Sequence, residues 1–220
     1  ESIREKFVPV LIKADDEILL ECLVMNADPE HDADFYEFDL KAVTEYRKKM
    51  LSAPVKDGKA VMEELIGQRR AEAEDDDMDW EKEILGEMEG GDTNDRFSSY
   101  WDDDTKMTYP LILAKIPVKN PWEIFVYLPF GNWNECPDTP ELMAAAKYWF
   151  EQYGAVPAAM SHDELEFLLP ASVPEEKAMD AAVELYGFCP DVIDQGPEDA
   201  TVGALADVLR LSTVWYFWWD

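Results

Sequence analysis

The sequence predicts an α/β or α+β fold, in which helices pack on a mixed β-sheet around a single core that carries an acidic insertion. Apolar runs of strand length alternate with stretches of helical periodicity, without strict β–α–β repetition. The chain has 220 residues, which is long enough to bury one large core. Hydrophobic residues make up 47% of it and include eight Trp, so a packed interior is expected rather than disorder.

Residues 1–71 are predicted to form a β-hairpin followed by helices. Phe7–Lys13 and Glu17–Met25 are apolar runs separated by three turn residues, a pattern typical of a hairpin. From Asp39, a candidate helix N-cap, apolar residues recur at helical spacing. A second helix is expected from about Gly58.

Residues 72–104 are predicted to be a mobile acidic insertion. The segment holds fifteen acidic side chains and only two cations, Lys82 and Arg96. A Ca²⁺-binding loop at Asp92–Asp95 lacks the glycine and the glutamate that the EF-hand pattern requires. A solvated segment between an N-terminal region and the core is therefore favoured.

Residues 105–220 are predicted to be the C-terminal α/β core. Tyr109–Val118 and Trp122–Leu128 are expected to be paired strands. Asp138-Thr-Pro-Glu141 combines a capping residue, an early proline and an acid, and predicts a helix start, while Gly154 predicts its end. The elements expected after it are strands at Ala155–Met160 and Leu165–Leu169, helices opening at Ser172–Glu175 and Thr201, and a terminal strand within Val214–Trp219. In that strand Trp215, Phe217 and Trp219 are expected on one face and Tyr216 and Trp218 on the other, with both faces buried.

The net charge of −30 is the most unusual property of the chain. Residues 121–220 hold 18 acidic side chains against three cations, Lys147, Lys177 and Arg210. Such a field favours a basic protein partner and disfavours nucleic acid and anionic membranes. No apolar run approaches the length of about 18 residues that a spanning helix needs. A monomer or a homodimer is expected, and a role of the charge in solubility alone stays open.

The number of cysteines indicates the redox state of the compartment in which the protein is expected. Three cysteines, Cys22, Cys136 and Cys189, without a secretory leader favour a reduced, cytoplasmic protein. Because the sequence does not begin with Met, a removed leader stays open.

Residues 121–220 contain a series of motifs in a fixed order. They are Phe130–Pro137, Lys147–Trp149, Tyr153–Ala155, His162-Asp163, Leu165-Glu166, Tyr186–Asp191, Asp194–Gly196 and Val214–Asp220. In these motifs the segment resembles the bacterial domain of unknown function 4253 family. The resemblance implies an intracellular bacterial α/β domain with no assigned activity. Some members of that family accompany toxin–immunity systems, so an immunity- or inhibitor-like role is the concrete form of a binding function.

The loop at 131–136 is the predicted binding site, since strand-to-helix loops often carry the working groups of α/β proteins. Its candidate residues are Asn132, Trp133, Asn134 and Glu135, and Gly131 permits a sharp turn before them. The alternative is a rigid structural loop in which the Asn side chains satisfy backbone groups.

A second set of candidates is built on a repeated Cys-Pro-Asp sequence, at 136–138 and 189–191. With His162 and Asp163, these residues could provide a zinc site or a Cys–His catalytic pair. The candidates are Cys136, His162, Asp163, Cys189 and Asp191, of which Cys136, His162 and Cys189 are the candidate metal ligands. A redox disulfide between the two cysteines is a third option. The favoured interpretation is structural, with two buried thiols and with each Asp capping a turn. His31, in an acidic loop, is expected to be solvated.

The expectation from the sequence is an uncharacterised cytoplasmic bacterial protein that binds a basic protein partner and needs no cofactor. The alternative is a Cys/His-dependent metal-binding protein, with zinc as the metal, or an enzyme of unknown reaction. An enzyme is the less favoured class, because no motif names a reaction.

Overall fold

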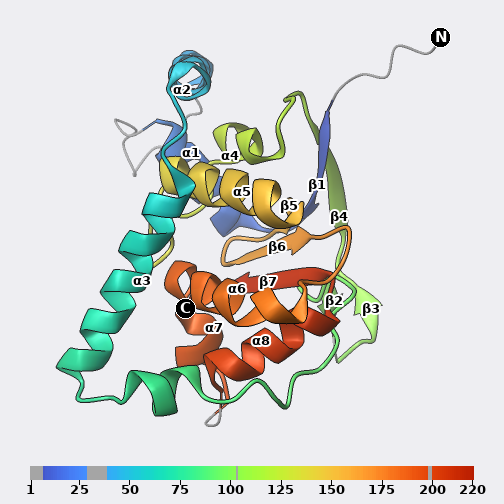
Figure 1. The fold of residues 1–220 in the computed structure, drawn as a ribbon. Coiled ribbons are helices and arrows are strands. Elements are labelled where there is room, and N and C mark those ends of the chain that lie inside the picture. Colours follow the sequence, from blue (N-terminus) through green and yellow to red (C-terminus); the bar gives the residue numbers. More distant parts are fainter. Residues whose placement is uncertain (1–6, 29–38, 103, 198–199) are drawn as a thin grey trace.

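A computed structural model of the chain describes residues 7–28, 39–102, 104–197 and 200–220 (Figure 1). Five strands form a mixed sheet in the order β4-β1-β5-β6-β7. All neighbours are antiparallel except β1 and β5, which run parallel. The strands are β1 (Val8–Lys13), β4 (Leu111–Ile116), β5 (Val156–Met160), β6 (Glu164–Leu168) and β7 (Val214–Trp218), and a separate small ribbon pairs β2 (Trp101–Asp102) with β3 (Met107–Thr108).

Helices pack on this sheet, and α3 runs along the helical layer that contains α5 and α6 (Figure 1). The α-helices are α1 (Glu17–Ala27), α2 (Leu40–Ser52), α3 (Gly58–Asp75), α4 (Ile124–Tyr127), α5 (Thr139–Tyr153), α6 (Glu175–Phe188), α7 (Asp191–Asp194) and α8 (Val202–Leu211). Two shorter helices of other types are η1 (Trp80–Leu85) and η2 (Pro121–Glu123). The predicted class, a mixed sheet with helices packed on it, is confirmed. No helix among the described residues is long and apolar enough to cross a membrane.

The predicted N-terminal hairpin is wrong, because its second strand is helix α1. Asp16 caps this helix by accepting a hydrogen bond from Leu19 N at 2.9 Å. Strand β1 does not pair with a neighbouring hairpin strand and instead lies inside the sheet between β4 and β5. The N-terminal region therefore supplies an internal strand of the same sheet as the C-terminal residues.

The predicted strand at Trp122–Leu128 is also wrong, because the segment forms η2 and α4. Asn120 and Glu123 make a capping box there, with Pro121 at the first helical position, which favours a helical turn. Ile124, Phe125 and Val126 are completely buried. An apolar run of this length suits a buried helix as well as a buried strand.

The other predicted elements of the core are confirmed. Asp138 and Glu141 form the expected capping box of α5, and Gly154 ends that helix in a left-handed conformation with φ of 71°. The Asp39 cap of α2, the start of α3 at Gly58, the strands β4 to β7, and the helices α6 and α8 also lie where the sequence places them.

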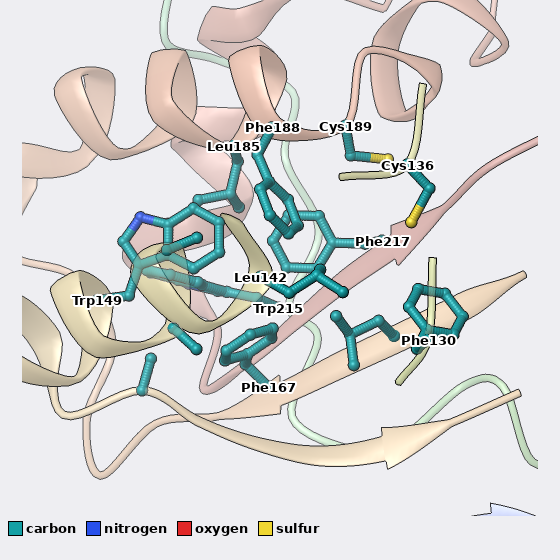
Figure 2. Close-up of a cluster of buried hydrophobic side chains, with 14 of the residues drawn as sticks. Phe130, Cys136, Leu142, Trp149, Phe167, Leu185, Phe188, Cys189, Trp215 and Phe217 are labelled. Carbon is teal, nitrogen blue, oxygen red and sulfur yellow. The ribbon is translucent and has the colours of Figure 1, made fainter. Parts of the chain in front are cut away.

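Aromatic side chains from α5, α6 and the sheet fill the main core (Figure 2). Trp149 stacks on Phe217 with ring centroids 5.6 Å apart and meets Phe167, Phe188 and Trp215 edge to face. The predicted alternation of β7 is confirmed for this face, since Trp215, Phe217 and Trp219 are at most 1% exposed. Tyr216 and Trp218 on the other face are only half-buried.

The segment predicted as an acidic insertion contacts the sheet in several places. Ser98 N donates to Glu166 Oε1 at 2.8 Å, and Ser99 Oγ donates to the same carboxylate, which is fully buried. The Tyr100 hydroxyl donates to Leu11 O and accepts from Met160 N, so it bridges β1 and β5. The mobility predicted for 72–104 stays a prediction, and these contacts give the segment a structural role.

Candidate functional site

The predicted binding loop is a tight turn fixed by its backbone. Gly131 has a φ of 80°, and a Cβ there would lie 2.4 Å from Pro137 O. Asn132 and Asn134 also have positive φ, which Asn tolerates better than most residues. Cys136 N donates to Trp133 O at 2.9 Å and closes the turn. The loop therefore presents its side chains in one defined arrangement.

A groove lies between this loop and helix α3, with a volume of about 450 Å³. Its walls are residues 132–138 with Glu141 on one side, and Val61, Glu64, Leu65 and Gln68 on the other. Trp133 lies half-buried in the wall, and within the described residues its indole N–H has no hydrogen-bond partner. Four carboxylates line the groove, from Glu64, Glu135, Asp138 and Glu141.

Arg69 connects the loop to α3. Its side chain is only 7% exposed, and its guanidinium lies 2.9 Å from Glu135 and 2.9 Å from Glu72. Burial raises the pKa of Glu72, although Arg69 acts in the opposite direction. Sequence reasoning missed Arg69. Its spacing from Met62 and Ala73, which are both buried on α3, could have placed it on the inner face of that helix.

The residues Trp218–Asp220 bring the predicted loops together. Asn134 Nδ2 donates to the carbonyl of Asp220, and Asp220 N donates to Asp191 Oδ2 at 3.0 Å. Trp218 Nε1 donates to Asp163 Oδ2 at 3.0 Å, and the Cys189 thiol donates to Trp218 O at 3.0 Å. The 131–136 loop, the 161–164 turn and the 189–191 loop are thus tied to one short segment.

His162 lies between two carboxylates. Its Nδ1 is 3.1 Å from Asp16 Oδ2 and its Nε2 is 3.5 Å from Asp163 Oδ1. Its backbone N also donates to Asp16, the residue that caps α1. No cysteine appears among the contacts of His162 in the described part of the chain. The structure therefore pairs this histidine with acids from two elements and not with a thiol.

The two core thiols lie at one end of the aromatic cluster (Figure 2). Cys136 is 4% exposed and Cys189 is completely buried. Burial raises the pKa of both thiols, and the pKa of Cys136 is raised further by Cys189 and Cys22. Both are therefore neutral thiols at neutral pH, which disfavours a thiolate nucleophile.

Cys136, His162 and Cys189 are also the candidate metal ligands. Among the residues that the structure describes, no group of three or more His, Cys, Asp or Glu side chains is placed to hold a metal ion. The three cysteines are free thiols, with Cys22 half-buried. His31 lies outside the described residues.

Comparison with known families gives one finding. Residues 112–220 match the family described as "Domain of unknown function (DUF4253)". The predicted resemblance is thereby confirmed for this segment. The match covers the 131–136 loop, β5 to β7 and all of β4 except Leu111. It covers neither β1 nor α3, which builds the opposite wall of the groove. No curated protein and no solved structure matches the chain.

Proposed function

We propose that the protein binds a basic protein partner through the groove between α3 and the 131–138 loop. The observation that carries the proposal is the lining of this groove, four carboxylates around a half-buried tryptophan. Carboxylates attract Lys and Arg side chains, and a tryptophan face binds cations and apolar stems alike. Tryptophan is also among the residues enriched at the energetic centres of interfaces.

The cations near the groove are already paired with carboxylates of this chain, and they do not neutralise all of its acids. Lys56 Nζ lies 3.0 Å from Glu141, and Arg69 is shared between Glu72 and Glu135. Glu64 is exposed in the same groove. The lining thus keeps excess negative charge, to which the −30 of the whole chain adds a long-range field.

The concrete form that we propose is an immunity- or inhibitor-like protein of the bacterial cytoplasm. Three free thiols fit a reducing compartment. The fixed backbone of the 131–136 loop fits a preorganised binding surface, which loses little conformational entropy on association. The alternative, a Cys/His-dependent enzyme or zinc protein, gains no comparable support, because its thiols are buried and neutral.

The test is recovery of binding proteins from a lysate of the source cell, with tagged wild-type protein and two variants. Glu64→Lys reverses a charge inside the groove, and Glu151→Lys makes the same change on α5, outside it. We expect a basic protein that wild type and Glu151→Lys retain, that salt releases, and that Glu64→Lys recovers at least about tenfold less well.

The association rate of the recovered partner should fall steeply with ionic strength, since electrostatic steering is screened by salt. A salt-insensitive rate, or equal recovery by Glu64→Lys and Glu151→Lys, would contradict the groove as the binding site.

A further inference from the structure

Strand β4 forms one edge of the sheet and leaves its outer side unpaired. It is antiparallel to β1, with Lys13 opposite Leu111 and Val8 opposite Ile116. Ala14 N donates to Pro110 O at 2.9 Å, so residues 110, 112, 114 and 116 point their backbone groups toward β1. Leu111, Leu113 and Lys115 therefore point theirs outward. Among the described residues, no backbone hydrogen bond reaches this side.

The side chains of this edge are apolar and unusually exposed. Leu111, Ile112 and Leu113 are 37%, 51% and 58% exposed. A long, exposed, apolar edge strand is a template for pairing with another chain, and proteins usually blunt such an edge with charges, bulges or a covering segment. Among the described residues, Leu111–Leu113 carry none of these, and Lys115 is the one charged residue of β4.

The edge is also free of acids in a strongly acidic protein. Residues 105–122 contain three lysines and no Asp or Glu, although the chain holds 49 acidic residues. Lys115 lies over the ring of Phe7, and Lys13 lies over the ring of Tyr109. A basic partner of the kind proposed for the groove finds no complementary charge here.

We propose that β4 pairs with β4 of a second copy of this chain, antiparallel and around a two-fold axis at Leu113. This centre places Leu113 opposite its own copy and Lys115 opposite Leu111, so no lysine faces a lysine. The pairing satisfies the outward backbone groups and covers the exposed leucines. Pro117 is the next outward position after Lys115 and ends the pairing there, because proline cannot donate to a ladder.

The charge of the chain explains why the acid-free edge is suited to self-association. Two copies, each with a net charge of −30, repel each other except where acids are missing. Salt screens this repulsion, so the dimer should become tighter as ionic strength rises. Binding at the groove is expected to become weaker under the same change. The two surfaces are therefore distinguishable by the sign of their salt dependence.

The first test is the mass of the purified full chain by light scattering or sedimentation, in low and high salt. We expect twice the monomer mass of 25.2 kDa at micromolar concentration, and a dimer fraction that increases with salt. Leu113→Lys should be monomeric with an unchanged circular dichroism spectrum. Leu168→Lys, which alters an equally apolar residue that is 46% exposed at the end of β6, should stay dimeric. A monomeric wild type, or a dimeric Leu113→Lys, overturns the proposal.

The second test fixes the register and does not depend on how Leu113→Lys folds. Residues opposite each other in a hydrogen-bonded antiparallel pair have Cα atoms about 5.5 Å apart, within the range of a disulfide. Leu113→Cys should therefore form a covalent dimer on mild oxidation. Leu111→Cys, which faces Lys115 of the other copy, should not, but Leu111→Cys combined with Lys115→Cys should. Equal cross-linking of both single variants, or of neither, overturns the two-fold axis at Leu113. If the wild type is monomeric and captures an acidic protein, the proposed dimer is wrong and the β4 edge binds that protein instead.

Discussion

The two edge strands of the sheet, β4 and β7, treat their unpaired backbone groups in opposite ways. Along β7, Asn94 O accepts from Val214 N, and Asn94 Nδ2 donates to Val214 O, as a neighbouring strand would. Further along, the Cys189 thiol donates to Trp218 O. Along β4, no backbone hydrogen bond from the described residues reaches the outward groups, and the leucines are exposed. The fold thus covers one edge with its own chain and leaves the other available.

The difference shows what the acidic segment 72–104 does for the fold. Its residue Asn94 pairs with Val214 at the β7 edge, and Ser98 and Ser99 hold Glu166 of β6. A segment that composition alone describes as a solvated insertion therefore contains contacts to β7, β6, β5 and β1.

The largest effect is expected from a chain that ends at Thr213. It lacks β7 and with it Trp215, Phe217 and Trp219, each at most 1% exposed. Burial of one such ring stabilises by roughly 2–3 kcal/mol, so the loss is comparable to a typical total stability of about 5–15 kcal/mol. The shortened chain should show no cooperative thermal transition by circular dichroism. A cooperative melt near the parent temperature would mean that β7 is dispensable.

A smaller loss of stability is expected from Tyr100→Phe, which removes the contacts of this hydroxyl with β1 and β5. The variant removes the bridge between Leu11 O and Met160 N and leaves a buried N–H without a partner. We expect the free energy of unfolding to fall by about 1–3 kcal/mol in chemical denaturation. Tyr109→Phe, which keeps the ring that Lys13 covers, is the matched control and should stay within about 0.5 kcal/mol.

The Glu166 carboxyl should make stability depend on pH. Burial raises its pKa, and the hydrogen bonds from Ser98 and Ser99 only partly oppose this. The folded protein therefore holds the Glu166 proton more tightly than the unfolded chain does. This contribution is fully present below the unfolded pKa of about 4.3 and is lost as the pH rises through the folded pKa.

Wild type should accordingly lose stability relative to Glu166→Gln as the pH rises from about 4 to 7, which thermal melts of both proteins across this range can measure. The general charge repulsion of the chain is nearly the same in both proteins and cancels in the difference. A difference in melting temperature that does not change with pH would show that Glu166 does not titrate as expected.

The smallest effect is expected at the open edge. Leu113→Thr should change the stability of the dilute monomer by no more than about 0.5 kcal/mol, because Leu113 is 58% exposed. Val214→Thr, on the covered edge at 2% exposure, buries a hydroxyl and should cost about 1–3 kcal/mol. Equal costs for the two variants in urea denaturation would show that the edges do not differ as described.

Much of the fold follows from local sequence signals. The capping box at Asp138 and Glu141 and the alternation of Trp215 and Phe217 were predictable, because both depend on neighbouring residues. The two wrong strands have a common cause. Apolar runs at Glu17–Met25 and Trp122–Leu128 show no period that separates a buried helix from a strand. The signals that decide for a helix are the caps before them, Asp16 and Asn120.

The candidate site was predictable only in part. The 131–136 loop was identified from its glycine and its position before a helix, and the structure places a groove beside it. The opposite wall comes from α3, about 70 residues earlier in the chain, and no local pattern indicates that approach. Likewise, the meeting of Asn134, Asp163, Cys189 and Asp191 at Trp218–Asp220 depends on how β7 pairs with β6, which a single sequence does not specify.

The Trp218–Asp220 segment has a practical consequence for anyone who attaches a tag or a fluorescent protein. Both backbone groups of Asp220 are engaged, the N–H with Asp191 and the carbonyl with Asn134 of the binding loop. A fusion joined directly after this residue lies next to both contacts, so a flexible spacer keeps it away from the turn that carries Trp133.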